Sequence, residues 1–174
     1  MAFIPLPDPA GMSDTQREVY ERFPANLVRG MLCATLEVAD AYERLATVFP
    51  KASLEPKLRE MTILRVAAVS GSAYERMQHI DSAHSAGVTD AEVAALESGR
   101  YDELTNQEAA VLRFVDELID TPKAATTRKA ALQTLGDVNL ATLTVLVGCY
   151  MMTARFVETL DIELDDAPTS WDNT

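Results

Sequence analysis

The chain has 174 residues, 48% of them hydrophobic, and its formal net charge is −12 at pH 7. This length predicts one domain with a closed core. The sequence has no stretch of about 18 consecutive apolar residues, so it does not predict a membrane span. The negative charge argues against nucleic acid and anionic membranes as partners, since both attract basic proteins. The N-terminus lacks the basic start and apolar run of a signal peptide, so we expect a cytoplasmic protein.

Cysteine and histidine are scarce in this sequence. Cys33 and Cys149 lie in separate apolar segments and form no CxxC pair, which favours buried free thiols. The only histidines are His79 and His84, and no spacing of ligands suggests zinc. We therefore expect neither a metal nor another cofactor.

The N-terminal quarter begins with a proline-rich extended arm, residues 1–12, which suits a segment lying over a neighbour. Ser13 then caps a helix that runs to about Phe23, before Pro24. Apolar residues at spacings of three and four predict a second helix from Asn26 to about Phe49.

The middle of the chain holds a strong helix start at Ser53–Pro56, with Ser53 as cap and proline in the first turn. Residues 58–87 read as two helices broken at Ser70-Gly71 and ended by Gly87. Thr89 with Glu92, and later Thr105 with Glu108, form two capping boxes that each open a further helix.

The C-terminal third continues with an alanine-rich helix to about Leu135, a turn at Gly136-Asp137 and a long helix over 139–160. That last helix is apolar almost all round, so we expect it to be central or shared with another subunit. Residues 165–174 read as a frayed tail in which Trp171 could dock. The sequence thus predicts one all-α domain over 1–174, a bundle of about eight helices.

Glu60 stands where the helical pattern asks for a hydrocarbon. On a helical wheel it falls in the middle of an apolar arc that includes Ile63, Leu64 and Ala67. A carboxylate in such a place must be paired, or kept protonated by burial, which would raise its pKa.

His79 lies on a ridge of small and polar residues in the following helix, together with Ser72 and Glu75. If the two helices pack as a hairpin, Glu60 and His79 meet, and a carboxylate that orients an imidazole is a proton-transfer pair. The alternative is an interior hydrogen bond that serves structure alone.

Three motifs resemble the carboxymuconolactone decarboxylase family, which also contains the alkylhydroperoxidase D-like proteins. They are LxxxLRExxILRVA, YExxxH and AxxxGVTxxEVxAL, and here they occupy Ser53 to Leu96. NLVRG from Asn26, and the closing segment from Val147 to Leu164, also look like decarboxylase-type members. The resemblance covers nearly the whole chain and implies an alkylhydroperoxidase D-like fold.

The resemblance also bears on thiol chemistry. Peroxidase-type members pair a redox CxxC with a helix glutamate and a histidine four residues after the second cysteine. Glu60 and His79 match the glutamate and the histidine, whereas Ser72 and Glu75 stand at the two cysteine positions. Because serine and glutamate cannot cycle between thiolate and disulfide, we expect no thiol peroxidase activity.

For decarboxylase-type members, the resemblance implies cofactor-free proton transfer on a small carboxylated or lactone-like molecule. His79 would move the proton and Glu60 would orient its ring. Tyr74 or Ser72 would donate to the developing oxyanion, and Glu75 would hold the charge of His79 or act as a second base.

An arginine is expected for the substrate carboxylate, and Arg155 and Arg76 are the candidates. His84 falls beside Met77 and Ile80, which favours a core or subunit-interface histidine over a catalytic one.

Three hypotheses of function remain open: a cofactor-free lyase or isomerase, a binding or assembly protein that lost the chemistry, and a hydrolase or cyclisation enzyme in the same pocket. The partner that we expect is a small-molecule substrate. We also expect a homo-oligomer, a dimer, trimer or hexamer, because the last helix and the arm expose much hydrocarbon.

Overall fold

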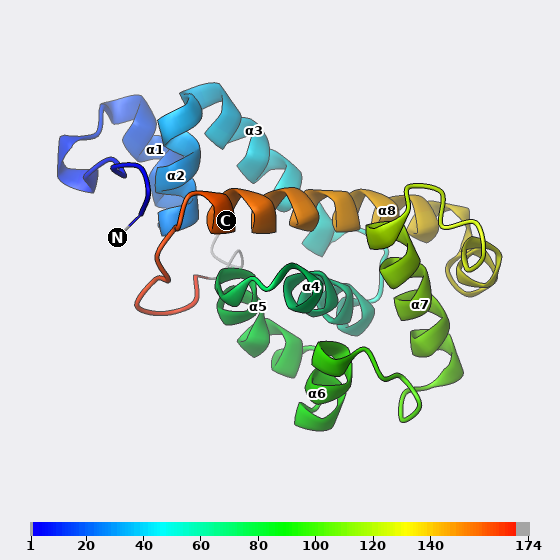
Figure 1. The fold of residues 1–174 in the computed structure, drawn as a ribbon. Helices are drawn as coiled ribbons and strands as arrows, with labels where there is room; N and C mark the ends of the chain where they lie inside the picture. The colour runs from blue at the N-terminus through cyan, green and yellow to red at the C-terminus, as the bar shows by residue number, and fades with distance from the viewer. Residues whose placement is uncertain (1, 170–174) are drawn as a thin grey trace.

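The computed structural model describes residues 2–169, which form an all-α fold with no β-strand in that range (Figure 1). The α-helices are, in chain order, α1 (Asp14–Arg22), α2 (Asn26–Ala34), α3 (Leu36–Ala46), α4 (Pro56–Ser70), α5 (Ala73–Ser85), α6 (Asp90–Ser98), α7 (Asn106–Asp120) and α8 (Arg128–Thr159). Two short 3₁₀ helices, Pro9–Gly11 and Phe49–Lys51, complete the element order. The predicted class of fold is confirmed.

Helix α4 is central, and it packs against α5, α6, α7 and α8. Its residues contribute to two apolar clusters, with Ile63 and Val66 in the larger and Met61 and Leu64 in the smaller. Because α4 is covered on several sides, Glu60 is shielded from water and buried. Gly71, at φ 66°, ends α4 in the left-handed conformation and turns the chain into α5, which produces the predicted hairpin.

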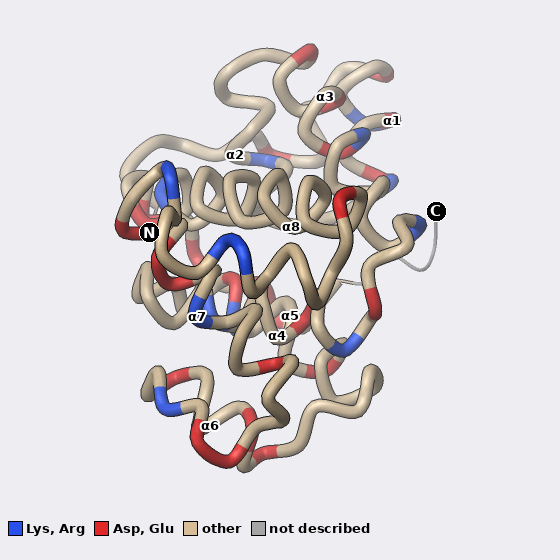
Figure 2. The backbone as a smooth tube through the Cα atoms, turned by 90° about the vertical axis from the view of Figure 1, so that its right-hand side faces the viewer, with Lys and Arg blue, Asp and Glu red and all other residues tan. Residues whose placement is uncertain are grey.

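Helix α8 lies across the molecule between α4 and the α2–α3 pair (Figure 1). Gly136, at φ 71° and ψ 173°, interrupts it at the predicted turn, and the two parts run in different directions (Figure 1). By length and composition alone α8 could cross a membrane. Its packing on α4 and α7 is equally what the core helix of a soluble protein shows. Acidic residues are spread over the other elements, while the central turns of α8 contain no charged residue (Figure 2).

The predicted single helix over 26–49 is wrong in one respect: it is interrupted at Thr35, which separates α2 from α3. Thr35 adopts an extended conformation (φ −159°), and its hydroxyl oxygen accepts from the Val38 N–H to cap α3. The predicted cap Ser53 is also wrong: Glu55 caps α4, accepting from the N–H groups of Lys57 and Leu58. Ser53 donates to Asn139 instead.

Both terminal segments are held by the chain itself. In the N-terminal arm, the Phe3 N–H donates to the Leu160 carbonyl, and Arg29 donates to the Pro7 carbonyl. The arm therefore has partners within its own chain, contrary to expectation. Residues 163–169 are tied to α2 and α5 rather than frayed. The predicted docking of Trp171 lies outside the described residues.

Candidate active site

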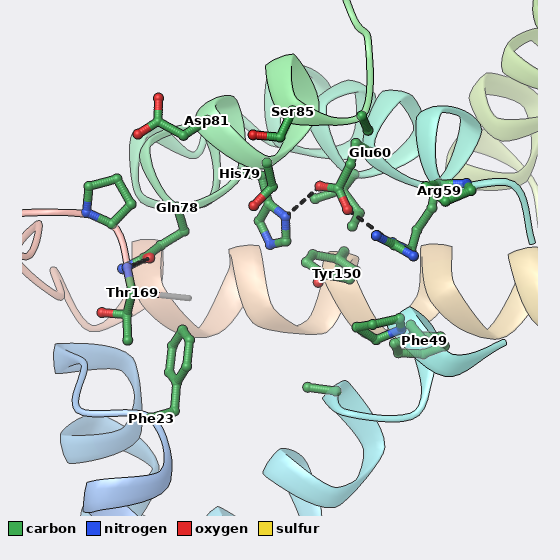
Figure 3. A pocket seen from close by; sticks show the side chains of 17 residues that line it. Phe23, Phe49, Arg59, Glu60, Gln78, His79, Asp81, Ser85, Tyr150 and Thr169 are labelled. Atoms are coloured by element: carbon green, nitrogen blue, oxygen red, sulfur yellow. Dashed lines mark hydrogen bonds and ion pairs between the residues drawn. The ribbon is translucent and has the colours of Figure 1, made fainter. Parts of the chain in front are cut away.

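Glu60 and His79 meet across the α4–α5 hairpin. Glu60 occupies the second turn of α4 and His79 the middle of α5, and Nδ1 of His79 lies 3.0 Å from Oε2 of Glu60 (Figure 3). Both side chains are buried. The contact predicted from helical periodicity is therefore present.

Burial, the contact between the two side chains, and the neighbours Arg59 and Glu75 set the charge of this pair. Burial raises the pKa of Glu60, but the hydrogen bond from His79 and the charges of His79 and Arg59 outweigh it and leave the pKa below its ordinary value. Burial lowers the pKa of His79, and Glu60, followed by Glu75, raises it above its ordinary value. A charged Glu60 only accepts hydrogen bonds, so Nδ1 carries the proton and Nε2 is the nitrogen that can exchange one.

A cavity of about 480 Å³ adjoins the pair. Its apolar wall comes from the residue after α1, the end of α3, the α3–α4 connection, α4 and α8, and its polar wall from α4, the second half of α5 and the C-terminal segment. The lining residues are Phe23, Ala46, Phe49, Pro50, Pro56, Arg59, Glu60, Ile63, Gln78, His79, Asp81, Ser82, Ser85, Ala86, Tyr150, Pro168 and Thr169. This volume and mixed lining are typical of a site for a small organic molecule.

Arg59 is the arginine of this cavity, and the sequence reasoning missed it. Its Nε lies 2.9 Å from Oε1 of Glu60, so the guanidinium is held at the cavity wall opposite the Gln78 end (Figure 3). Arg155 and Arg76, the arginines expected there, do not line the cavity. Arg155 is exposed on α8, and Arg76 pairs with Glu97 beside a separate, smaller pocket.

Tyr150 of α8 is a second residue that the sequence reasoning treated only as core. Its ring meets the His79 ring edge-on, with centroids 5.0 Å apart, and it lines the cavity. Burial raises the pKa of Tyr150 well above its ordinary value, so its hydroxyl stays a neutral donor.

Glu75 lies on the other side of the imidazole, buried beneath the cavity lining. Its Oε2 is 3.9 Å from Nε2 of His79, and Glu75 precedes His79 by one turn of α5. Burial raises the pKa of Glu75 to about 7, partly offset by the charge of His79. The imidazole is thus flanked by one ionised carboxylate and one that titrates near neutrality.

Two expected oxyanion donors are placed elsewhere. The Tyr74 hydroxyl donates to Asp165 and accepts from the Leu27 N–H, away from the cavity. Ser72 caps α5 and lines the smaller pocket. Every α5 residue that lines the cavity comes at or after Gln78, so the first turn of the helix lies beyond it.

The remaining histidine and the cysteines stand apart. His84 is exposed, with Nε2 3.1 Å from Asp90, so the core placement is wrong. Cys33 is exposed, contrary to expectation, whereas Cys149 is buried, and both are free. Among residues 2–169, no three His, Cys, Asp or Glu side chains are grouped to hold a metal ion.

Comparisons with known proteins relate part of this chain to one family and its fold to one solved structure. The model of the carboxymuconolactone decarboxylase family matches residues 37–117, which contain Arg59, Glu60 and His79. No curated protein matches the sequence. A crystal structure from Agrobacterium tumefaciens shares the fold with a TM-score of 0.70 and 19% sequence identity, covering 76% of this chain and 93% of that one. That protein is described as being of unknown function and, provisionally, as the antioxidant defence protein AhpD. Residues 37–117 are thus similar to the carboxymuconolactone decarboxylase family, and the chain has an AhpD-like fold.

Proposed function

We propose that this protein is a cofactor-free enzyme, a lyase or isomerase, that moves a proton on a small carboxylated or lactone-like molecule. The observation that carries the proposal is the Glu60–His79 pair at the wall of the 480 Å³ cavity. A buried carboxylate that fixes an imidazole beside a cavity is the arrangement used for general acid–base catalysis. We place the reaction in the cytoplasm as part of the same proposal.

In the proposed reaction, Nε2 of His79 takes a proton from the carbon next to the substrate carbonyl. The C–H electron pair forms a carbon–carbon double bond, and the carbonyl oxygen becomes an enolate oxygen. The imidazolium returns the proton at a second carbon, which gives an isomer. In a decarboxylation, the bond to the carboxyl group breaks, CO₂ leaves, and the imidazolium protonates the resulting enolate.

Two cavity residues support the remaining roles. The guanidinium of Arg59 is positioned to pair with a substrate carboxylate, because only its Nε is engaged by Glu60 in the described contacts. The hydroxyl of Tyr150, which stays protonated, is the neutral donor for the enolate oxygen. Tyr150 takes the role that the resemblance implied for Tyr74.

Thiol peroxidase chemistry, which the name of the Agrobacterium protein raises, fits this site poorly. Ser72 and Glu75 occupy the positions of the two redox cysteines. Burial raises the pKa of Cys149 to about 11, so that thiol is a poor nucleophile at neutral pH. We therefore expect any peroxide consumption to survive Cys33→Ser and Cys149→Ser unchanged.

The proposal is tested by proton exchange in D₂O, followed by NMR on a panel of enolisable acids such as levulinate and carboxylated unsaturated butyrolactones. The wild-type protein should accelerate deuterium incorporation next to the carbonyl of at least one member. His79→Gln should abolish the acceleration, and Glu60→Gln should lower it roughly 10²-fold or more, within the usual range for acid–base groups. His84→Gln is the matched control, because His84 is exposed and does not line the cavity.

Two outcomes contradict the proposal. One is a panel on which the wild-type protein has no effect, which favours a binding protein on the same fold. The other is a Glu60→Gln variant that melts at a lower temperature but exchanges protons at the wild-type rate, as expected of a purely structural pair.

A further inference from the structure

The chain after α8 returns to the cavity. Asp161 adopts a positive φ of 48°, Ile162 is buried, and its N–H donates to the Val157 carbonyl, so α8 ends with a sharp turn. The following segment, residues 163–169, passes over α2 and α5. Pro168 and Thr169 then form part of the cavity wall.

One carboxylate, that of Asp165, holds this segment in place. It accepts hydrogen bonds from the Asn26 N–H at 2.8 Å, from Nε2 of Gln78 at 2.7 Å and from the Tyr74 hydroxyl. Bonds to a carboxylate are stronger than those between neutral groups. Asn26, Tyr74 and Gln78 are therefore the clamp of residues 163–169.

The clamp explains the NLVRG motif, which the proposed reaction does not use. The side-chain amide of Asn26 also donates to the carbonyls of Glu163 and Leu164, at 3.2 and 3.3 Å. Gly30 lets α2 approach the end of α8, because a Cβ there would lie 3.0 Å from the Phe156 ring and 3.1 Å from the Ile162 side chain. The motif thus shapes the surface on which the segment lies.

Gln78 connects the clamp to the catalytic pair. While its Nε2 donates to Asp165, its Oε1 accepts the Thr169 N–H at 2.7 Å, and the next residue is His79 (Figure 3). From these contacts we infer that residues 163–169 are a functional wall of the cavity, and that the clamp on Asp165 controls access to His79 and the size of the molecule admitted. The size-limiting part rests on the proposed function, while the control of access does not.

Access is measured without a substrate, by acylation with diethyl pyrocarbonate. A neutral imidazole nitrogen attacks the reagent and gains a carbethoxy group, with release of ethanol and CO₂. Peptide mass spectrometry gives the rate at His79 relative to that at His84, whose side chain is 43% exposed against 11% for His79. Asp165→Ala should raise this ratio roughly tenfold, because the clamp no longer opposes local opening.

Asp166→Ala is the matched control, since Asp166 is the exposed neighbour of Asp165 and should leave the ratio unchanged. Tyr74→Phe removes one clamp donor without changing the cavity lining, and it should raise the ratio of acylation rates by less. This variant tests the inference if Asp165→Ala does not fold. Wild-type ratios in folded Asp165→Ala or Tyr74→Phe protein would overturn the inference. A changed ratio in a protein that exchanges no substrate protons would uphold the wall and reject the proposed reaction.

Discussion

At the residue scale, the imidazole of His79 has a different carboxylate at each nitrogen. Glu60 is ionised and hydrogen-bonded to Nδ1, whereas Glu75 lies 3.9 Å from Nε2 and has a pKa of about 7. Glu60 fixes the tautomer of the His79 imidazole. Glu75 changes its own charge near neutral pH, where His79 is proposed to act as a base. The two acids therefore act on His79 in different ways, although their side chains are equally buried.

Glu75→Gln should shift the pH dependence of proton exchange towards lower pH. Proton abstraction needs neutral His79, so the rate rises with pH through the pKa of His79. The charge of Glu75 raises that pKa, and the variant removes this charge. The rising limb of kcat/KM against pH, measured by exchange into D₂O, is the readout. Glu97→Gln, on the exposed pair with Arg76, is the control, and an unmoved limb in Glu75→Gln would refute the coupling.

Arg59→Gln should weaken the binding of a carboxylate more than that of its ester. The guanidinium lines the cavity and also pairs with Glu60, so turnover falls for both kinds of molecule. Only an acid loses the ion pair, which is worth roughly tenfold or more in KM when shielded from water. Comparing KM for levulinate and methyl levulinate separates the two effects. Equal changes in KM for both would show that Arg59 does not bind the carboxylate.

Helical periodicity was sufficient to find Glu60 and His79, because Glu60 interrupts an apolar arc and His79 lies on the polar ridge of the next helix. Arg59 and Tyr150 gave no such signal, since an arginine beside a glutamate and a tyrosine in an apolar helix are ordinary. The contacts of Asp165 with Asn26 and Gln78 join residues 139 and 87 positions apart. Only the tertiary fold brings such residues together.

At the scale of elements, capping boxes predicted the starts of α6 and α7 because both partners lie within one turn. The turn at Gly136 was predicted from the sequence because the backbone conformation found there is one that only glycine adopts readily. The break at Thr35 was missed because apolar spacing continues across it without proline or glycine. There, packing of α3 on α1, with Arg22 paired to Asp40, outweighs the continuity of the helix.

The contact between α1 and α3 contains a buried acid, and Glu43→Gln should stabilise the protein at alkaline pH. Glu43 is 2% exposed, neither carboxylate oxygen has a hydrogen bond, and burial raises its pKa to about 7, partly offset by Arg22. A folded-state pKa above the ordinary value of 4.5 contributes stability below that value. This contribution is lost as pH rises through about 7.

The Glu43 variant keeps the size of the side chain and cannot ionise. Its free energy of unfolding in urea should exceed that of the wild type by about 1–3 kcal/mol more at about pH 8 than at about pH 5. Glu21→Gln, on the exposed side of α1, is the control and should show no such difference. A gain of the same size at both pH values would mean that ionisation of Glu43 is not the cause.

At the scale of the whole molecule, α8 is central on one side and bare on the other. Val138, Val145 and Met152 recur every seven residues and are 70, 52 and 46% exposed, and we call them the outer face of α8. The turns between Val138 and Ala154 carry no charged residue. A continuous apolar row on a central helix is typical of a subunit interface.

We therefore propose that the protein is a homo-oligomer, a dimer, trimer or hexamer, assembled through the outer face of α8. Sedimentation equilibrium at micromolar concentration should give a mass that is a multiple of 19.0 kDa. Val145→Glu places a charge in the middle of this face, where burial against a second copy would cost several kcal/mol, so the variant should sediment as a monomer. Val69→Glu, at a valine of similar exposure near the end of α4, adds the same charge away from the face and should leave the mass unchanged. A wild-type protein found only at the monomer mass, or a Val145→Glu variant that stays assembled, would show that this face does not join subunits.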